Sequence, residues 1–378
     1  MREHRNFVKK AYGLSCGYQI WDMICTTLRL GTAFHEYYYY GFYKKPMKER
    51  REYASMGFMY EFQKKNNPPQ KRVILSDKIK FFDAYKEFLG RSWMNPLLGS
   101  VKDIAAFIAG KEKIVLKGST GGGGKNVKIL RIAGNTPEKI LQLAQELHFD
   151  ILEEFVYQHD DLQRLAPNSL NTVRFITQLN QDGGVDIIGA SLRMGIYKNT
   201  DNLSSGGITA KINVETGVIE SDGVSFDITL PDYKVHPVSN MKIQGFRVPY
   251  WKEVRQLCVN ATSKYGDNKS IGWDVAIKQD GPILIEGNHD WGARVWQMPA
   301  GTGFYQNISN QIIVPMKTIL ITGIGGMTPR SIARFIKKRY PNYKIIGIDA
   351  NPKALGFYMQ GLIDKGYVAP RMDDPAYW

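Results

Sequence analysis

The chain has 378 residues, with 50 lysines and arginines against 36 aspartates and glutamates, which leaves a net charge of +14. Hydrophobic residues make up 43% and charged residues 23%, so the chain can bury the cores of two or three domains, and wholesale disorder is disfavoured. No stretch supplies the roughly 20 apolar residues that a membrane span needs, which disfavours an integral membrane protein.

The first part of the chain is predicted to be helical, aromatic and basic. Residues 1–66 hold Tyr37 to Tyr40 in a row, and a break follows at Asn67-Pro68-Pro69. Residues 1–110 carry 19 basic and 10 acidic side chains. Such a surplus suits an anionic partner: a membrane surface, a nucleic acid or a phosphorylated substrate. The alternative is a basic surface that is merely solvated. Among the anionic partners, we expect no nucleic acid, and we allow peripheral contact with a membrane through this basic region.

Residues 70–315 combine strands and helices without strict alternation, and this pattern predicts an α+β domain. A helix is expected from Ser76, and residues 225–248 are expected to be irregular. Further helices are predicted over residues 137–148 and 251–265. Strands are predicted over residues 113–116, 127–132, 150–156, 172–179, 185–194, 207–214, 271–278 and 282–287.

From residue 316 the pattern begins again, with a strand over 317–322, a helix over 329–339 and a strand over 343–349. This is the opening of a Rossmann-like βαβ unit, which is expected to end one helix later. Two strands do not make a stable sheet alone. The predicted limits are therefore a helical region (1–69), an α+β domain (70–315) and a partial βαβ tail (316–378).

The last predicted hairpin carries the strongest chemical signal. A three-residue loop, Gln279-Asp280-Gly281, would place Asp274 opposite Glu286, with Asn288 on the same face. Hard oxygen ligands around an open site suit Mg²⁺ held together with substrate phosphates. Exposed strands also carry acidic residues, but Glu286 follows an apolar run, an expensive place for an unpaired carboxylate.

A glycine-rich loop connects the first two predicted strands. It contains Gly118, Ser119 and Thr120, followed by Gly121, Gly122, Gly123 and Gly124. Small residues let backbone amides approach phosphate oxygens, and Lys117 just before the loop can direct a charge at the same group. The pattern is not a P-loop, because a strand follows it rather than a helix. A tight hairpin is the alternative, although it does not need four consecutive glycines.

Arg174 lies on a predicted strand and alternates with Val173 and Phe175. It is either a surface charge or, beside a phosphate and metal site, a group that neutralises charge during phosphoryl transfer. The three cysteines, Cys16, Cys25 and Cys258, show no metal-ligand spacing and favour a reducing, cytoplasmic location.

The order of these motifs resembles the ATP-grasp superfamily and, more narrowly, the sugar-transfer-associated ATP-grasp family. The resemblance extends over about residues 70–300, and it is carried by ordered motifs: Glu153-Glu-Phe-Val-Tyr-Gln-His159, Asn171-Thr-Val-Arg174, Asp201-Asn-Leu-Ser-Ser-Gly-Gly207 and Ile271-Gly-Trp-Asp274. It implies two α+β lobes that clasp ATP.

The resemblance also implies roles for individual residues. The adenine would contact the segment Glu153, Glu154, Phe155 and Val156, and Asp161 would bind the ribose. Lys78 (or Lys80), Lys117, Ser119 and the glycine loop would hold the phosphates. Asp274, Glu286 and Asn288 would bind Mg²⁺, or Mn²⁺ in its place, and Arg174 and Asn202 would lie near the γ-phosphate.

The implied activity is an ATP-dependent carboxylate–amine (or thiol) ligase that acts through an acyl phosphate, in cell-surface polysaccharide or sugar-conjugate assembly. Its substrates would be a small carboxylate and an amine, in some cases sugar-linked. A small-molecule kinase on the same fold and a nucleotide-binding regulatory protein are the alternatives. The tail resembles the start of a carbamoyl-phosphate-synthetase-like ATP-grasp protein, and a functional NAD site in it is not expected.

Overall fold

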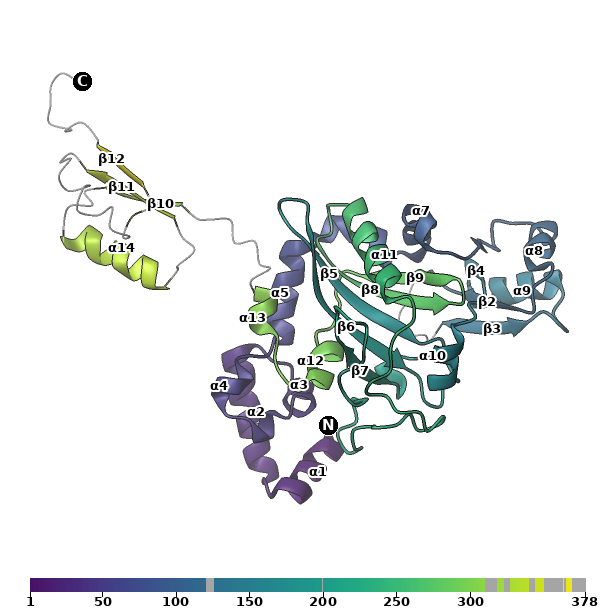
Figure 1. Cartoon of the computed structure of the whole chain (residues 1–378), viewed down its shortest axis with the longest axis horizontal. Helices are drawn as coiled ribbons and strands as arrows, with labels where there is room; N and C mark the ends of the chain where they lie inside the picture. Colours follow the sequence, from purple (N-terminus) through teal and green to yellow (C-terminus); the bar gives the residue numbers. More distant parts are fainter. Residues whose placement is uncertain are drawn as a thin grey trace. The chain divides into compact units, whose positions relative to one another are not determined.

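The computed structural model describes residues 1–119, 126–198, 200–309, 318–322, 327–339, 344–349, 363 and 365–368. The chain forms two compact units, residues 1–311 and 312–378 (Figure 1). The N-terminal helices belong to the first unit, together with two antiparallel sheets. Of the glycine-rich loop, Gly121, Gly122, Gly123 and Gly124 lie outside the described residues.

Residues 1–66 are helical, as predicted. Serines begin two of the helices: the side chain of Ser15 accepts a hydrogen bond from the amide of Tyr18, and that of Ser55 accepts one from Phe58. The helices are α1 (Arg2–Tyr12), α2 (Cys16–Leu30), α3 (Phe34–Tyr39), η1 (Phe42–Lys44), α4 (Met47–Arg50) and α5 (Met56–Asn66). None of the helices in the described part of the chain has the length and hydrophobicity to cross a bilayer.

The N-terminal helices enclose an aromatic core of their own, which includes Tyr37, Tyr38 and Phe42. Its polar centre is the buried ion pair between Asp22 and Arg50, with 2.8 Å between Oδ1 and Nη1. Helix α12 (Arg294–Ala300) joins this core to the rest of the unit, because the Gln297 side chain accepts a hydrogen bond from the amide of Ala54.

The smaller sheet has four strands in the order β1-β4-β2-β3, and all its neighbouring strands run antiparallel. Apolar side chains of helices α8 and α9 pack against it in one core. These elements are β1 (Trp93–Met94), α8 (Val101–Ile108), β2 (Lys113–Lys117), β3 (Val127–Arg131), α9 (Pro137–Leu147) and β4 (Ile151–Glu154).

The larger sheet has five strands in the order β7-β6-β5-β8-β9 (Figure 1). Helix α11 (Trp251–Lys264) packs on one face of it, where Trp273 donates a hydrogen bond to Thr262. The strands are β5 (Thr172–Leu179), β6 (Val185–Met194), β7 (Ile208–Ile212), β8 (Ser270–Lys278) and β9 (Gly281–Asn288). The shorter elements are η2 (Pro69–Lys71), α6 (Val73–Ser76), α7 (Lys78–Ala84), η3 (Lys86–Phe88), α10 (Asp160–Leu165), η4 (Leu203–Ser205) and α13 (Tyr305–Ser309).

The turn of the last hairpin differs from the prediction. Lys278 pairs with Gly281, so the loop has two residues rather than three. Continued without interruption, this register would place Glu286 opposite Trp273, on the core side. A register shift, with Ile285 as the extra residue, restores the pairing of Asp274 with Glu286. The predicted pairing is confirmed, but a β-bulge produces it and not the turn.

The second unit contains β10 (Thr318–Thr322), α14 (Met327–Arg339), β11 (Lys344–Asp349) and β12 (Lys365–Val368). The three strands are parallel, in the order β10-β11-β12. The expectation of only two strands is therefore wrong. The missed strand, Lys365–Val368, is short and contains a glycine, so its sequence lacks the apolar alternation that reveals strands.

Candidate active site

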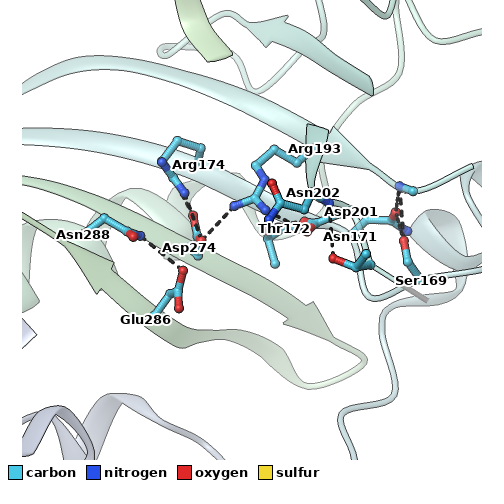
Figure 2. Close-up of polar contacts among 12 residues, drawn as sticks. Ser169, Asn171, Thr172, Arg174, Arg193, Asp201, Asn202, Asp274, Glu286 and Asn288 are labelled. Atoms are coloured by element: carbon cyan, nitrogen blue, oxygen red, sulfur yellow. Dashed lines mark hydrogen bonds and ion pairs between the residues drawn. The ribbon is translucent and has the colours of Figure 1, made fainter. Parts of the chain in front are cut away.

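The five-stranded sheet has one face that carries Trp273 and packs in the core, and the site lies on the other face. Backbone pairing places Arg174 of β5 opposite Asp274 of β8, and Asp274 opposite Glu286 of β9. Side chains alternate along strands, so Val173 and Val275 turn to the core while Arg174 and Asp274 turn to the other face. Figure 2 shows these polar side chains gathered across neighbouring strands.

Three oxygen-bearing side chains converge on the last two strands. Asn288 Nδ2 lies 3.5 Å from Glu286 Oε1 and 3.2 Å from the carbonyl oxygen of Gly272. Burial and, after it, the neighbouring Asp274 carboxylate raise the pKa of Glu286 to about 7. In the described part of the chain, no group of three His, Cys, Asp or Glu side chains is arranged to hold a metal ion. Two carboxylates and one amide oxygen nevertheless form a donor set that suits Mg²⁺ together with phosphate oxygens.

Two buried guanidinium groups compensate the charge of Asp274. Arg174 Nε lies 2.5 Å from Asp274 Oδ1, and Arg193 Nη1 lies 2.8 Å from Oδ2 (Figure 2). Although burial opposes ionisation, Arg174 and Arg193 lower the pKa of Asp274 below its ordinary value. Asp274 is therefore an anion inside the protein, and both of its carboxylate oxygens accept hydrogen bonds from arginines.

Arg193 also bonds a second acid, which extends the network to the next loop. Arg193 Nη2 lies 2.9 Å from Asp201 Oδ1, and Asp201 Oδ2 accepts a hydrogen bond from the amide of Thr172 at 2.9 Å. Our sequence analysis missed Arg193 as a site residue. The available signal was its position one residue before the end of a long apolar strand, where an unpaired charge is costly.

Arg174 and Asn202, predicted near the γ-phosphate, flank this network. The described hydrogen bonds of Arg174 go to Asp274, so it directly supports a predicted metal ligand. Asn202 follows Asp201 and begins the turn η4. Their predicted phosphate contacts stay predictions.

A second charged cluster lies on the smaller sheet. Lys117 Nζ is 2.6 Å from Glu153 Oε1, and Arg91 Nε is 3.0 Å from Oε2. Burial lowers the pKa of Lys117, while Glu153 and, more weakly, Glu286 act to raise it. Glu286 of the larger sheet thus lies close enough to Lys117 of the smaller sheet to act on its charge.

Arg91, another residue that the sequence analysis missed, connects the two sheets. Besides Glu153 it donates a hydrogen bond to the carbonyl oxygen of Leu284 at 2.6 Å and one to that of Ile285 at 3.5 Å. Both carbonyls belong to the bulge that directs Glu286 into the site. Arg91 follows a glycine in a loop, and no periodic pattern distinguished it.

The remaining predicted nucleotide residues are distributed around these clusters. Lys78 Nζ donates a hydrogen bond to the carbonyl oxygen of Ser119 at 3.2 Å, and Lys80 is exposed. The choice between them as a phosphate ligand stays a prediction. Glu154 accepts a hydrogen bond from the Ser92 hydroxyl at 3.0 Å.

At the far end of the predicted adenine segment, the Phe155 ring packs against Tyr157, and Val156 precedes that tyrosine. Asp161 forms an ion pair with Arg164 at the start of α10. Their nucleotide contacts stay predictions.

The family model described as sugar-transfer-associated ATP-grasp matches residues 58–312 of the chain. The chain belongs to the sugar-transfer-associated ATP-grasp family. It has the ATP-grasp fold, with the two antiparallel sheets described above inside the matched region. No curated protein matches the sequence at a significant level.

Solved structures of ATP-grasp proteins are distantly similar to this family member. The ATP-grasp ligase PsnB, complexed with a minimal precursor, is 13% identical over 70% of each chain, with a TM-score of 0.40. The D-alanine–D-alanine ligase from Coxiella burnetii is 9% identical over 63% of this chain and 56% of its own, with a TM-score of 0.37. A RimK domain protein from Sphaerobacter thermophilus is 13% identical over 64% and 69%, with a TM-score of 0.37.

Proposed function

We propose that this ATP-grasp protein is an ATP- and Mg²⁺-dependent ligase that joins a carboxylate to an amine or a thiol. The observation that carries the proposal is the convergence of Asp274, Glu286 and Asn288 on one sheet face, next to two buried arginines. Oxygen donors bind the cation, and fixed positive charges stabilise a phosphoryl group in transfer.

The proposed reaction has two steps. A carboxylate oxygen of the first substrate attacks the γ-phosphorus of ATP, and the bond to ADP breaks, which leaves an acyl phosphate. The amine or thiol then attacks the carbonyl carbon, phosphate leaves, and the nucleophile loses its proton.

The protein's own residues bind and orient the reactants. Lys117 and Lys78 would hold phosphates, and Asp274, Glu286 and Asn288 would hold Mg²⁺ (or Mn²⁺), which supplies charge neutralisation when it is bound. No nucleophilic side chain is needed, because ATP activates the carboxylate.

Trapping of the intermediate tests the proposal. With ATP, Mg²⁺ and a panel of carboxylates, the protein should release ADP, and added hydroxylamine should capture the acyl phosphate as a hydroxamate. A kinase on the same fold would phosphorylate a hydroxyl group and yield no hydroxamate. Absence of any ATP turnover across carboxylates, amines and thiols would favour the nucleotide-binding regulatory protein instead.

The substrate class is a separate proposal. The family description names sugar transfer, so we place the reaction in cytoplasmic assembly of a cell-surface polysaccharide or sugar conjugate. A screen of ADP release against amino acids, amino sugars and polyamines should show the largest stimulation with a sugar-linked carboxylate or amine.

Deletion of residues 316–378 should leave nucleotide affinity unchanged, because every described candidate for the site lies in the unit formed by residues 1–311. Titration of the truncated and full chains with a fluorescent ATP analogue measures this directly. Loss of affinity in a folded, soluble truncated protein would show that the tail takes part in binding.

A further inference from the structure

Helix α2 carries its polar and apolar faces in reverse. The side chains that it buries are mainly polar, namely Gln19, Asp22 and Thr26, with Met23 beside them. The side chains that it exposes are mainly apolar, namely Ile20, Trp21, Ile24 and Leu28. Trp21 is 62% exposed and Leu28 is 81% exposed. A surface helix normally shows the opposite arrangement.

The inward orientation is fixed by polar contacts, so the helix cannot rotate to bury its apolar side. Asp22 accepts hydrogen bonds from Arg50 and from the Tyr37 hydroxyl, both at 2.8 Å. Gln19 donates one to the carbonyl oxygen of Leu14 at 2.8 Å and accepts one from the Tyr38 hydroxyl at 3.1 Å. A rotation would break these buried bonds and leave their partners unsatisfied.

The outward residues form one continuous stripe. Ile20, Ile24 and Leu28 follow one another at four-residue intervals, so they line one side of the helix with Trp21 next to them. The ring of Tyr18 lies 6.2 Å from that of Trp21. A contiguous exposed apolar surface of this kind marks a site of contact with a protein or a membrane.

The exposed charges of helices α1 and α2 distinguish between these partners. Helix α2, which the structure describes in full, exposes one charged residue, Arg29. The neighbouring helix α1 contacts α2, since Gln19 also bonds the carbonyl oxygen of Arg5, and α1 exposes Arg2, Lys9 and Lys10 with one acid, Glu3. In a symmetric dimer through the N-terminal helices, the exposed basic residues of two copies would repel each other.

We propose that α2 binds an anionic lipid bilayer, with its apolar stripe among the outer acyl segments and the basic residues of α1 at the headgroups. Trp and aliphatic side chains flanked by Lys and Arg are the chemistry of helices that lie in the membrane interface. The protein would thus work at a membrane surface, and this inference does not depend on the ligase reaction.

Vesicle flotation of the full chain tests the inference. Wild type should float with vesicles of equal parts phosphatidylcholine and phosphatidylglycerol, and much less with phosphatidylcholine alone. Leu28→Glu and Trp21→Gln should each weaken binding by about tenfold or more, because a polar group then enters the apolar layer. The matched control is Leu98→Glu, since Leu98 is 86% exposed and lies outside the N-terminal helices. Far-ultraviolet circular dichroism verifies that each variant is folded.

Selective loss of flotation in Leu28→Glu and Trp21→Gln supports the membrane contact. Absence of wild-type flotation, or equal binding by Leu28→Glu and Leu98→Glu, would overturn it. A dimer in light scattering that both stripe variants convert to monomer would assign the face to a second copy and would also overturn it.

Discussion

Replacement of Glu286 by glutamine should reduce ATP-dependent turnover by about 10²-fold or more while the protein stays folded. The loss is expected because a carboxylate that binds the cation becomes a neutral amide. Folding should survive because burial and the neighbouring Asp274 carboxylate already raise the pKa of Glu286 to about 7, so the folded protein gains little from its charge. ADP release and thermal unfolding of the same preparation measure the two effects.

The matched control is Glu253→Gln, an exposed glutamate on α11. It should keep both turnover and thermal stability. Normal ADP formation by Glu286→Gln would contradict the metal-site assignment, and equal losses in both variants would show that the effect is not specific to the site.

Replacement of Arg193 by alanine should lower the free energy of unfolding by about 3–5 kcal/mol, since it leaves two buried carboxylates without their shared partner. Asp201 should contribute more to this loss than Asp274, because burial raises the pKa of the Asp201 carboxyl group and Arg193 is the main charge that opposes the rise. Asp274 keeps Arg174. Urea denaturation measures the change.

Arg164→Ala provides the comparison, because Arg164 is 67% exposed and its ion pair with Asp161 lies in solvent. Such a pair should contribute less than about 1 kcal/mol. Addition of Asp201→Asn to the Arg193→Ala variant should recover part of the lost stability, since it removes one uncompensated charge. Equal stability losses in Arg193→Ala and Arg164→Ala would refute the proposed role of Arg193.

The order of the elements and the central pairing could be predicted from the sequence, because both follow from local alternation. The strands over residues 172–179 and 185–194 have the predicted bounds, and Asp274 lies opposite Glu286 as expected. The turn between Lys278 and Gly281 was predicted wrongly. A two-residue turn followed by a bulge at Ile285 gives the same pairing of Asp274 with Glu286 as a three-residue loop without a bulge. Alternation alone therefore cannot distinguish these two arrangements.

The charged partners of the site could not be predicted, because their roles depend on contacts between distant segments. Arg193 meets Asp274 at a separation of 81 residues, and Arg91 meets Glu153 at 62. Neither arginine belongs to a periodic pattern that indicates a partner. The exposure of the apolar face of α2 could not be predicted either, because a stripe of apolar residues on a helix does not reveal which face of the helix the rest of the protein covers.

The position of Arg91 has a consequence for the motion of the two sheets. One guanidinium group bonds both Glu153, proposed to lie beside the adenine, and the carbonyls of Leu284 and Ile285, one residue before the proposed metal ligand Glu286. Any separation of the two sheets would therefore have to break this bridge or pivot about it. The residues proposed to bind the base and those proposed to bind the cation are thus mechanically linked through the Arg91 side chain.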